Sequence, residues 1–156
     1  MALRTIRTDQ EPCLYKKCRP VERFDGKLGE LIDDMFETMY ENAGAGLAGP
    51  QVGILRRVCV IDAVDRKIEL VNPVITEKTG LQGGMEGCLS FPGQSGYVER
   101  AEKVTVEGFD RHGDPVRYET EGFEARAVQH ELDHLDGIVY LTLVTEPPEG
   151  YDDEEE

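Results

Sequence analysis

The sequence predicts a single α+β domain in which antiparallel β-strands pack around a central helix, with another helix near the N-terminus. Apolar residues recur at helical spacing in two stretches, and strand-like stretches that include a hairpin lie between them. A chain of 156 residues can bury one core and is too short for two ordinary domains. We expect the domain over residues 1–145 and a disordered acidic tail over 146–156.

Composition indicates a protein of the cytoplasm. Apolar residues make up 39% of the chain and charged residues 31%, and no apolar run approaches the roughly 20 residues that span a bilayer. The first residues show no export or transit segment. The formal net charge of -15 repels phosphate backbones and anionic lipids, so neither a direct nucleic-acid ligand nor a membrane is expected.

The first helix is predicted from Leu28 to Asn42, where apolar side chains follow the helical period. The stretch AGAGLAGPQVGI (43–54) comes next and holds four glycines and a proline. This composition predicts a loop without regular structure, whose backbone can approach a ligand closely.

Strands are predicted in three stretches: RRVCVIDAV (56–64), KIELVNPVITE (67–77) and EKVTVEGFDRHGDPVRYE (102–119). The last stretch reads as a hairpin that turns at RHGDP. Between the second and third stretches, GLQGGMEGCLSFPGQSG (80–96) is rich in glycine and is predicted to be another loop.

The second helix is predicted over FEARAVQHELDHL (123–135), with Gly137 as its C-terminal cap. One face carries the apolar stripe Val128, Leu132 and Leu135. Nearly opposite lie Phe123, Ala127, His130 and His134. Since only a narrow polar strip remains, we expect this helix to be buried over most of its circumference.

Residues 130–134 read HELDH, which is the HExxH spacing of catalytic zinc sites. His130 and His134 lie one helical turn apart, so both imidazoles can reach the same ion. Glu131 is turned about 100° from His130 and can address a water molecule without binding the metal. The alternative is two histidines and an incidental acid.

A catalytic site of this kind needs a third protein ligand. The metzincin pattern would place a histidine at position 140, but Tyr140 stands there. His112 belongs to the predicted hairpin turn and is expected to face solvent. Cys88 follows a glycine-rich stretch, and a thiolate binds zinc or ferrous iron well. A loop cysteine is equally often a buried apolar residue, so the spacing alone leaves this assignment open.

Three segments in order, GAGLAGPQVGI (44–54), EGCLS (86–90) and QHELDH (129–134), resemble the signature motifs of peptide deformylases. The resemblance extends over residues 10–143. It implies antiparallel sheets around the HExxH helix and a metal hydrolase that removes the formyl group from the N-terminal formylmethionine of nascent proteins.

The resemblance also implies roles for individual residues. One divalent ion would be held by Cys88, His130 and His134, natively ferrous iron, with zinc, nickel or cobalt as substitutes. A water on that ion would attack the formyl carbon, with Glu131 as general base and acid. The remaining implied residues are Gln51 and the amide of Leu89 on the formyl oxygen, and Gly46 along the substrate backbone. Arg100 is a further candidate for substrate contact, with an ordinary strand arginine as the alternative.

The chain ends in TEPPEGYDDEEE, whose prolines and charges do not support the C-terminal helix through which some bacterial members dock at the ribosome. We therefore expect only transient proximity to the ribosome, and a monomer. The competing functions are a thiol-ligated HExxH metallopeptidase that cuts peptide bonds and a non-catalytic metal-binding module. Glu131 disfavours the module, because a structural site fills all four positions and needs no base.

Overall fold

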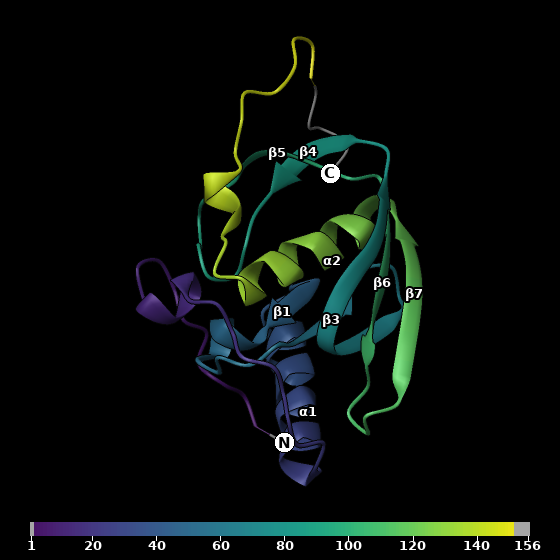
Figure 1. The fold of residues 1–156 in the computed structure, drawn as a ribbon. Helices are drawn as coiled ribbons and strands as arrows, with labels where there is room; N and C mark the ends of the chain where they lie inside the picture. Colours follow the sequence, from purple (N-terminus) through teal and green to yellow (C-terminus); the bar gives the residue numbers. More distant parts are fainter. Residues whose placement is uncertain (1, 152–156) are drawn as a thin grey trace.

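A computed structural model of the chain describes residues 2–151 and shows two α-helices and seven strands (Figure 1). The helices are α1 (Gly26–Glu41) and α2 (Gly122–Leu135). The strands are β1 (Gly46–Ala48), β2 (Val58–Asp62), β3 (Lys67–Thr79), β4 (Gln82–Glu86), β5 (Gly96–Arg100), β6 (Lys103–Phe109) and β7 (Pro115–Glu121). No helix within the described residues has the length and apolar character needed to cross a membrane.

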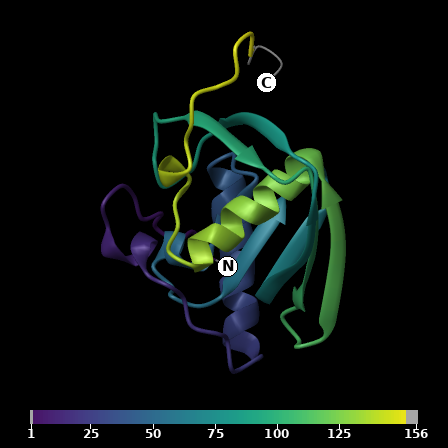
Figure 2. The ribbon, with the colours of Figure 1, turned by 45° about the horizontal axis from the view of Figure 1, so that its top comes forward.

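The strands form two sheets on either side of α2. The larger sheet has the order β1-β2-β3-β6-β7, the smaller one pairs β4 with β5, and every pairing is antiparallel. Helix α2 lies between the two sheets, and α1 covers the opposite face of the larger sheet (Figures 1 and 2). The predicted α+β class, with antiparallel sheets around the second helix, is confirmed.

Strand β2 separates two apolar cores because successive side chains of a strand point to opposite faces. Val58 and Val60 pack into the cluster built on α1. Cys59 and Ile61 pack into the cluster built on α2. All four side chains are fully buried. This strand and its neighbour β1 therefore fix the position of α2 relative to the rest of the molecule.

Both predicted helices are confirmed, with ends within two residues of the prediction. Helix α1 begins after Asp25, whose carboxylate caps it by accepting a hydrogen bond from the backbone N–H of Leu28 at 3.2 Å. Helix α2 is buried without interruption from Glu124 to Leu132, as its two-sided apolar pattern predicts. Gly137 follows it with a φ of 76°, which favours glycine at a helix end.

The prediction that both glycine-rich stretches are loops without regular structure is wrong in part: residues 87–95 form a loop as predicted, but other residues of both stretches do not. Residues 46–48 form β1 and pair with β2, a 3-10 helix follows over Gly49–Val52, and residues 82–86 form β4. The glycines of β4 reflect crowding, because a Cβ at Gly83 would overlap the Tyr97 hydroxyl on the paired strand. Glycine at position 83 therefore serves to let the Tyr97 ring lie close against β4, and it does not form a turn.

The segment after α2 returns to the smaller sheet. The backbone N–H of Thr145 donates to the carbonyl of Tyr97 at 2.9 Å, so residue 145 still belongs to the folded domain. Beyond it, the Tyr151 ring meets the Tyr97 ring edge-on at a centroid distance of 4.9 Å. The remainder of the predicted acidic tail, residues 152–156, lies outside the described residues, and disorder of the tail stays a prediction.

Candidate metal centre and active site

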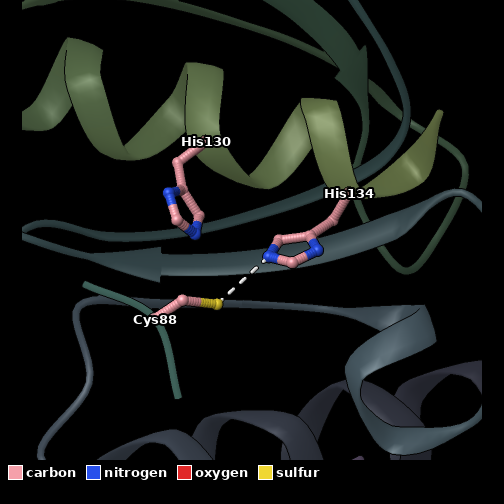
Figure 3. Close-up of side chains that lie close together, drawn as sticks. All are labelled: Cys88, His130 and His134. Carbon is pink, nitrogen blue, oxygen red and sulfur yellow. Dashed lines mark hydrogen bonds between the residues drawn. The ribbon is translucent and has the colours of Figure 1, made fainter. Parts of the chain in front are cut away.

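Three side chains from two parts of the chain converge beside α2. His130 and His134 project from consecutive turns of the helix, and Cys88 comes from the segment after β4 (Figure 3). One ligand atom from each residue lies within 4.8 Å of the other two. The Cys88 Sγ and His134 Nε2 atoms are 3.3 Å apart. The structure thus brings together all three predicted metal ligands.

Glu86 orients His130. Its Oε1 atom lies 2.9 Å from His130 Nδ1, which leaves Nε2 on the far side of the ring to face the metal site. Burial opposes charge on this imidazole, but hydrogen bonds to Cys88 and Glu86 raise the pKa of His130 to about 10. Burial and the neighbouring His130 lower the pKa of His134 well below its ordinary value. A bound cation would favour neutral imidazoles and a thiolate at Cys88.

Glu86 is also the centre of a buried ion-pair cluster. Arg100 donates to both of its carboxylate oxygens at 2.8 and 2.9 Å, and Arg126 donates to Oε2 at 2.6 Å. Arg100 pairs further with Asp133 at 2.7 Å. Burial raises the pKa of Glu86, but hydrogen bonds from Arg100 and His130 outweigh it and hold this pKa far below its ordinary value. Arg100 therefore lies among carboxylates, is 6% exposed, and does not line the pocket described below.

Replacing Glu86 by glutamine is expected to weaken metal binding about 10- to 100-fold, because the neutral amide holds the His130 ring less firmly than the carboxylate does. The same change leaves Arg126 without a charged partner and Arg100 with Asp133 alone, which we expect to cost about 3 kcal/mol of unfolding free energy. Metal titration and urea denaturation measure the two effects.

The matched control is Glu99→Gln, which changes an exposed carboxylate on neighbouring β5 that forms no ion pair within the described residues. This control should behave like the parent chain in both measurements. Unchanged metal affinity in the Glu86 variant would show that His130 does not depend on the cluster.

Glu131 is 4% exposed and presents a free oxygen. Its Oε1 atom is buried without a hydrogen-bond partner within residues 2–151. Burial raises the pKa of this carboxyl to about 7, and a cation bound nearby would lower it because positive charge favours the carboxylate. Gly46 of β1 lies directly against this group, since a Cβ at position 46 would stand 2.6 Å from Glu131 Oε2.

Gln51 is held at the edge of the site by its own hydrogen bonds. Its Oε1 accepts from the backbone N–H of Ala48 at 2.9 Å. That bond turns the amide nitrogen toward Ser90 Oγ at 3.1 Å and Cys88 Sγ at 3.4 Å. The backbone N–H of Leu89 has no hydrogen-bond partner within the described residues. Two donors therefore stand beside the metal ligands.

A pocket of about 450 Å³ opens over these groups. Its walls are residues 43–46, 85–89 and 91–94, with Gln51 and one side of α2. Of the predicted site residues, Gly46, Gln51, Cys88, Leu89, His130 and Glu131 line it. His134 is 1% exposed and lies behind the others, and His112 is exposed in the hairpin turn as predicted.

The chemistry of the donor set fits a divalent transition metal. A thiolate and two imidazoles suit zinc or ferrous iron, and three protein ligands leave a fourth position open for water or substrate. The buried carboxylate of Glu131, whose Oε1 has no partner within the described residues, lines the same pocket as Cys88 and His130. Fold and site together define a metal-dependent hydrolase.

Comparison with known proteins narrows this class. The family model for polypeptide deformylase matches residues 3–148. A peptide deformylase of Alkaliphilus metalliredigens is 53% identical over 144 residues, which are 92% of this chain and 98% of the relative. The solved peptide deformylase of Thermotoga maritima superposes with a TM-score of 0.90 at 39% identity, covering 92% and 99% of the two chains. The chain belongs to the peptide deformylase family, and is a metal-binding enzyme that removes the N-formyl group.

Sequence reasoning missed Glu86, Arg126 and Ser90 as parts of this site. Two of them carried a recognisable pattern: Glu86 stands two residues before Cys88, and Arg126 stands one helical turn before His130. A carboxylate next to a ligand and an arginine aligned with a histidine suggest an ion pair that supports the metal site. The hydroxyl of Ser90 gave no comparable pattern.

Proposed function

We propose that this chain deformylates the N-terminal formylmethionine of newly made proteins in the cytoplasm, using ferrous iron held by Cys88, His130 and His134. The observation that carries the proposal is the convergence of three ligand atoms within 4.8 Å, beside a buried glutamate oxygen that has no partner. The thiolate ligand favours iron or zinc over hard cations. Elemental analysis of protein purified without oxygen identifies the ion. If the ion is ferrous iron, we expect the protein to lose activity in air.

A divalent metal bound here supplies a water molecule of lowered pKa and polarises the formyl carbonyl. Glu131 is the group placed to take the proton of that water, because it lines the pocket and its Oε1 has no hydrogen-bond partner within the described residues. As the carbon–nitrogen bond breaks, Glu131 returns the proton to the departing amine. The products are formate and a free N-terminus.

Gln51 and Leu89 supply hydrogen bonds to the oxygen that gains negative charge. The Gln51 amide is preorganised by Ala48, so no reorientation is needed during the reaction. The Leu89 N–H has no competing acceptor within the described chain. Gly46 keeps the backbone of β1 close to Glu131 and leaves room for the substrate main chain.

Selectivity at the acyl side gives the test of this function. A formyl carbon bears only hydrogen and fits between Gln51, residues 86–90 and the ligands, whereas an acetyl methyl adds bulk at this point. We expect rapid formate release from formyl-Met-Ala-Ser, slow or no deacylation of acetyl-Met-Ala-Ser, and no cleavage of casein. Formate assays with mass spectrometry of all three substrates measure this.

Two results of these assays would contradict the expected selectivity. Casein fragments without formate release, from metal-loaded and oxygen-protected protein, would favour a metallopeptidase over the proposed reaction. Equal rates on the formyl and acetyl peptides would show that the pocket does not discriminate sterically at the acyl side.

A further inference from the structure

Positive charge is distributed unevenly over this acidic chain. Most arginines pair with a carboxylate within 4.0 Å, as Arg66 does with Glu124 and Arg111 with Glu69. Among the described residues, the cations without such a partner gather mainly in two segments that meet in space. They are Lys16, Lys17, Arg19, Arg23, Lys27 and Arg56. We call these six residues the cationic surface; elsewhere in residues 2–151 only Lys67 and Lys78 lack an ion-pair partner.

The backbone holds the two segments together. Residues 19 and 56 form a parallel bridge, with hydrogen bonds from Arg19 N to Leu55 O at 3.2 Å and from Arg57 N to Arg19 O at 3.0 Å. Cys18 is buried, so the flanking side chains of this extended segment face outward. The cations therefore stand on a fixed scaffold.

A groove continues this surface toward the start of α1. It measures about 320 Å³, has an apolar floor that includes Val21, and is bordered by Arg23, Lys27 and Arg56. Glu22 and Asp25 also line it, and the Asp25 carboxylate is engaged in capping α1. Three cations and two carboxylates border the groove, and Lys16, Lys17 and Arg19 add three cations without an ion-pair partner on the adjoining segment of a chain whose net charge is -15.

We propose that the cationic surface binds the phosphate backbone of single-stranded nucleic acid. A row of exposed cations along an extended segment suits a ligand with regularly repeated negative charge, and guanidinium groups bind phosphate by paired hydrogen bonds. The exposed ring of Tyr15 adjoins Lys16 and offers a face on which a base can stack. The net charge of the whole chain predicts no nucleic-acid ligand. The positive charges are nevertheless concentrated on the cationic surface, where they can attract phosphate locally.

An anionic membrane fits this surface less well. Stable binding to lipid needs apolar side chains that insert beside the cations. The large exposed apolar residues of the described chain, such as Leu3, Val74, Leu81 and Phe123, lie outside the cationic surface, and Tyr15 is the exception at its border.

The cationic surface and the catalytic pocket share no residue. None of the six cations lines the catalytic pocket. Lys27 stands at the start of α1, and the pocket wall at 43–46 follows its end, a separation of about 24 Å for 16 residues at 1.5 Å each. The proposal does not depend on the reaction mechanism described above.

The test is binding of a fluorescent 20-nucleotide uridine RNA, followed by anisotropy from 50 to 200 mM NaCl. We expect a Kd of about 10 µM at the lowest salt, weakening steeply as salt rises. The double variant Lys17→Gln with Arg56→Gln loses two positive charges. It should bind the RNA at least about fivefold more weakly, and the slope of log K against log salt should fall by about 1.4.

The matched control is Lys78→Gln with Lys103→Gln, which removes the same charge from two exposed lysines elsewhere; Lys78 has no ion-pair partner within the described residues, and Lys103 meets only the exposed Glu121, at 4.0 Å. It should bind RNA within about twofold of the parent chain. Both double variants should keep the parent melting temperature and the parent rate on a formylated tripeptide. No RNA binding by the parent chain at 50 mM NaCl would overturn the proposal, as would equal weakening in the two variants. Equally tight binding to phosphatidylglycerol vesicles would overturn the proposal in favour of an anionic lipid as the ligand. Equally tight binding to polyglutamate would overturn it in favour of an acidic protein.

Discussion

Replacing Glu131 by glutamine should reduce formate release at least about 100-fold while the metal and the fold are retained. Glutamine has nearly the same shape, but it cannot take a proton from water or return one to the amine. Because Glu131 contributes no ligand atom to the metal cluster, occupancy should stay at the level of the parent chain.

The measurement pairs turnover with metal content in the same preparations. Glu121→Gln serves as the control, since this exposed glutamate precedes the same helix and changes the same charge. Normal turnover in the Glu131 variant, with metal retained, would exclude this residue as the proton carrier. Loss of metal would instead show that its carboxylate supports the ligands.

Removing a single metal ligand should abolish activity. In Cys88→Ala or His134→Ala protein, two side chains remain, which are too few to hold an ion firmly. We expect metal content below about one tenth of an equivalent per chain and turnover reduced more than about 1000-fold, because water then lacks both its activation and its position.

Elemental analysis of variants purified in parallel measures this effect. Cys13→Ala and His112→Ala are the matched controls, because they remove the same side-chain types from positions outside the metal cluster. Both controls should keep about one ion per chain. Full occupancy after loss of Cys88 would overturn its assignment as a ligand.

The parts of the site that follow from local geometry could be predicted from the sequence. Two histidines four residues apart on a helix must share a face, so the pairing of His130 with His134 needed no knowledge of the fold. The burial of α2 on nearly all sides likewise followed from apolar residues on opposing faces.

The third ligand could not be derived in this way. Cys88 is 42 residues from His130 in the sequence, and only the packing of the smaller sheet against α2 brings them together. The residues themselves left a buried apolar cysteine as an equal alternative. The resemblance to a family supplied what local patterns lack, which is the spatial relation between distant segments.

Glycine was the main source of error in the predicted elements. Its weak strand propensity suggested loops at 43–54 and 80–96, yet β1 and β4 form there by pairing with β2 and β5. Glycine stands in these strands where a side chain would collide, as at Gly46 and Gly83. The ion-pair partners of Arg100 likewise could not be predicted from the sequence. A strand arginine near the site suggested substrate contact, and the structure instead surrounds it with Glu86 and Asp133.

The contact between Gly46 and Glu131 constrains how the enzyme can evolve under selection by an inhibitor. Any side chain at position 46 would begin with a Cβ 2.6 Å from the Glu131 carboxylate, so a substitution there displaces the group that we propose as the proton carrier. An inhibitor that binds the backbone of residue 46 would therefore contact a position at which we expect every substitution to reduce activity. We expect resistance to arise instead at the outer wall of the pocket, where Phe123 is 55% exposed.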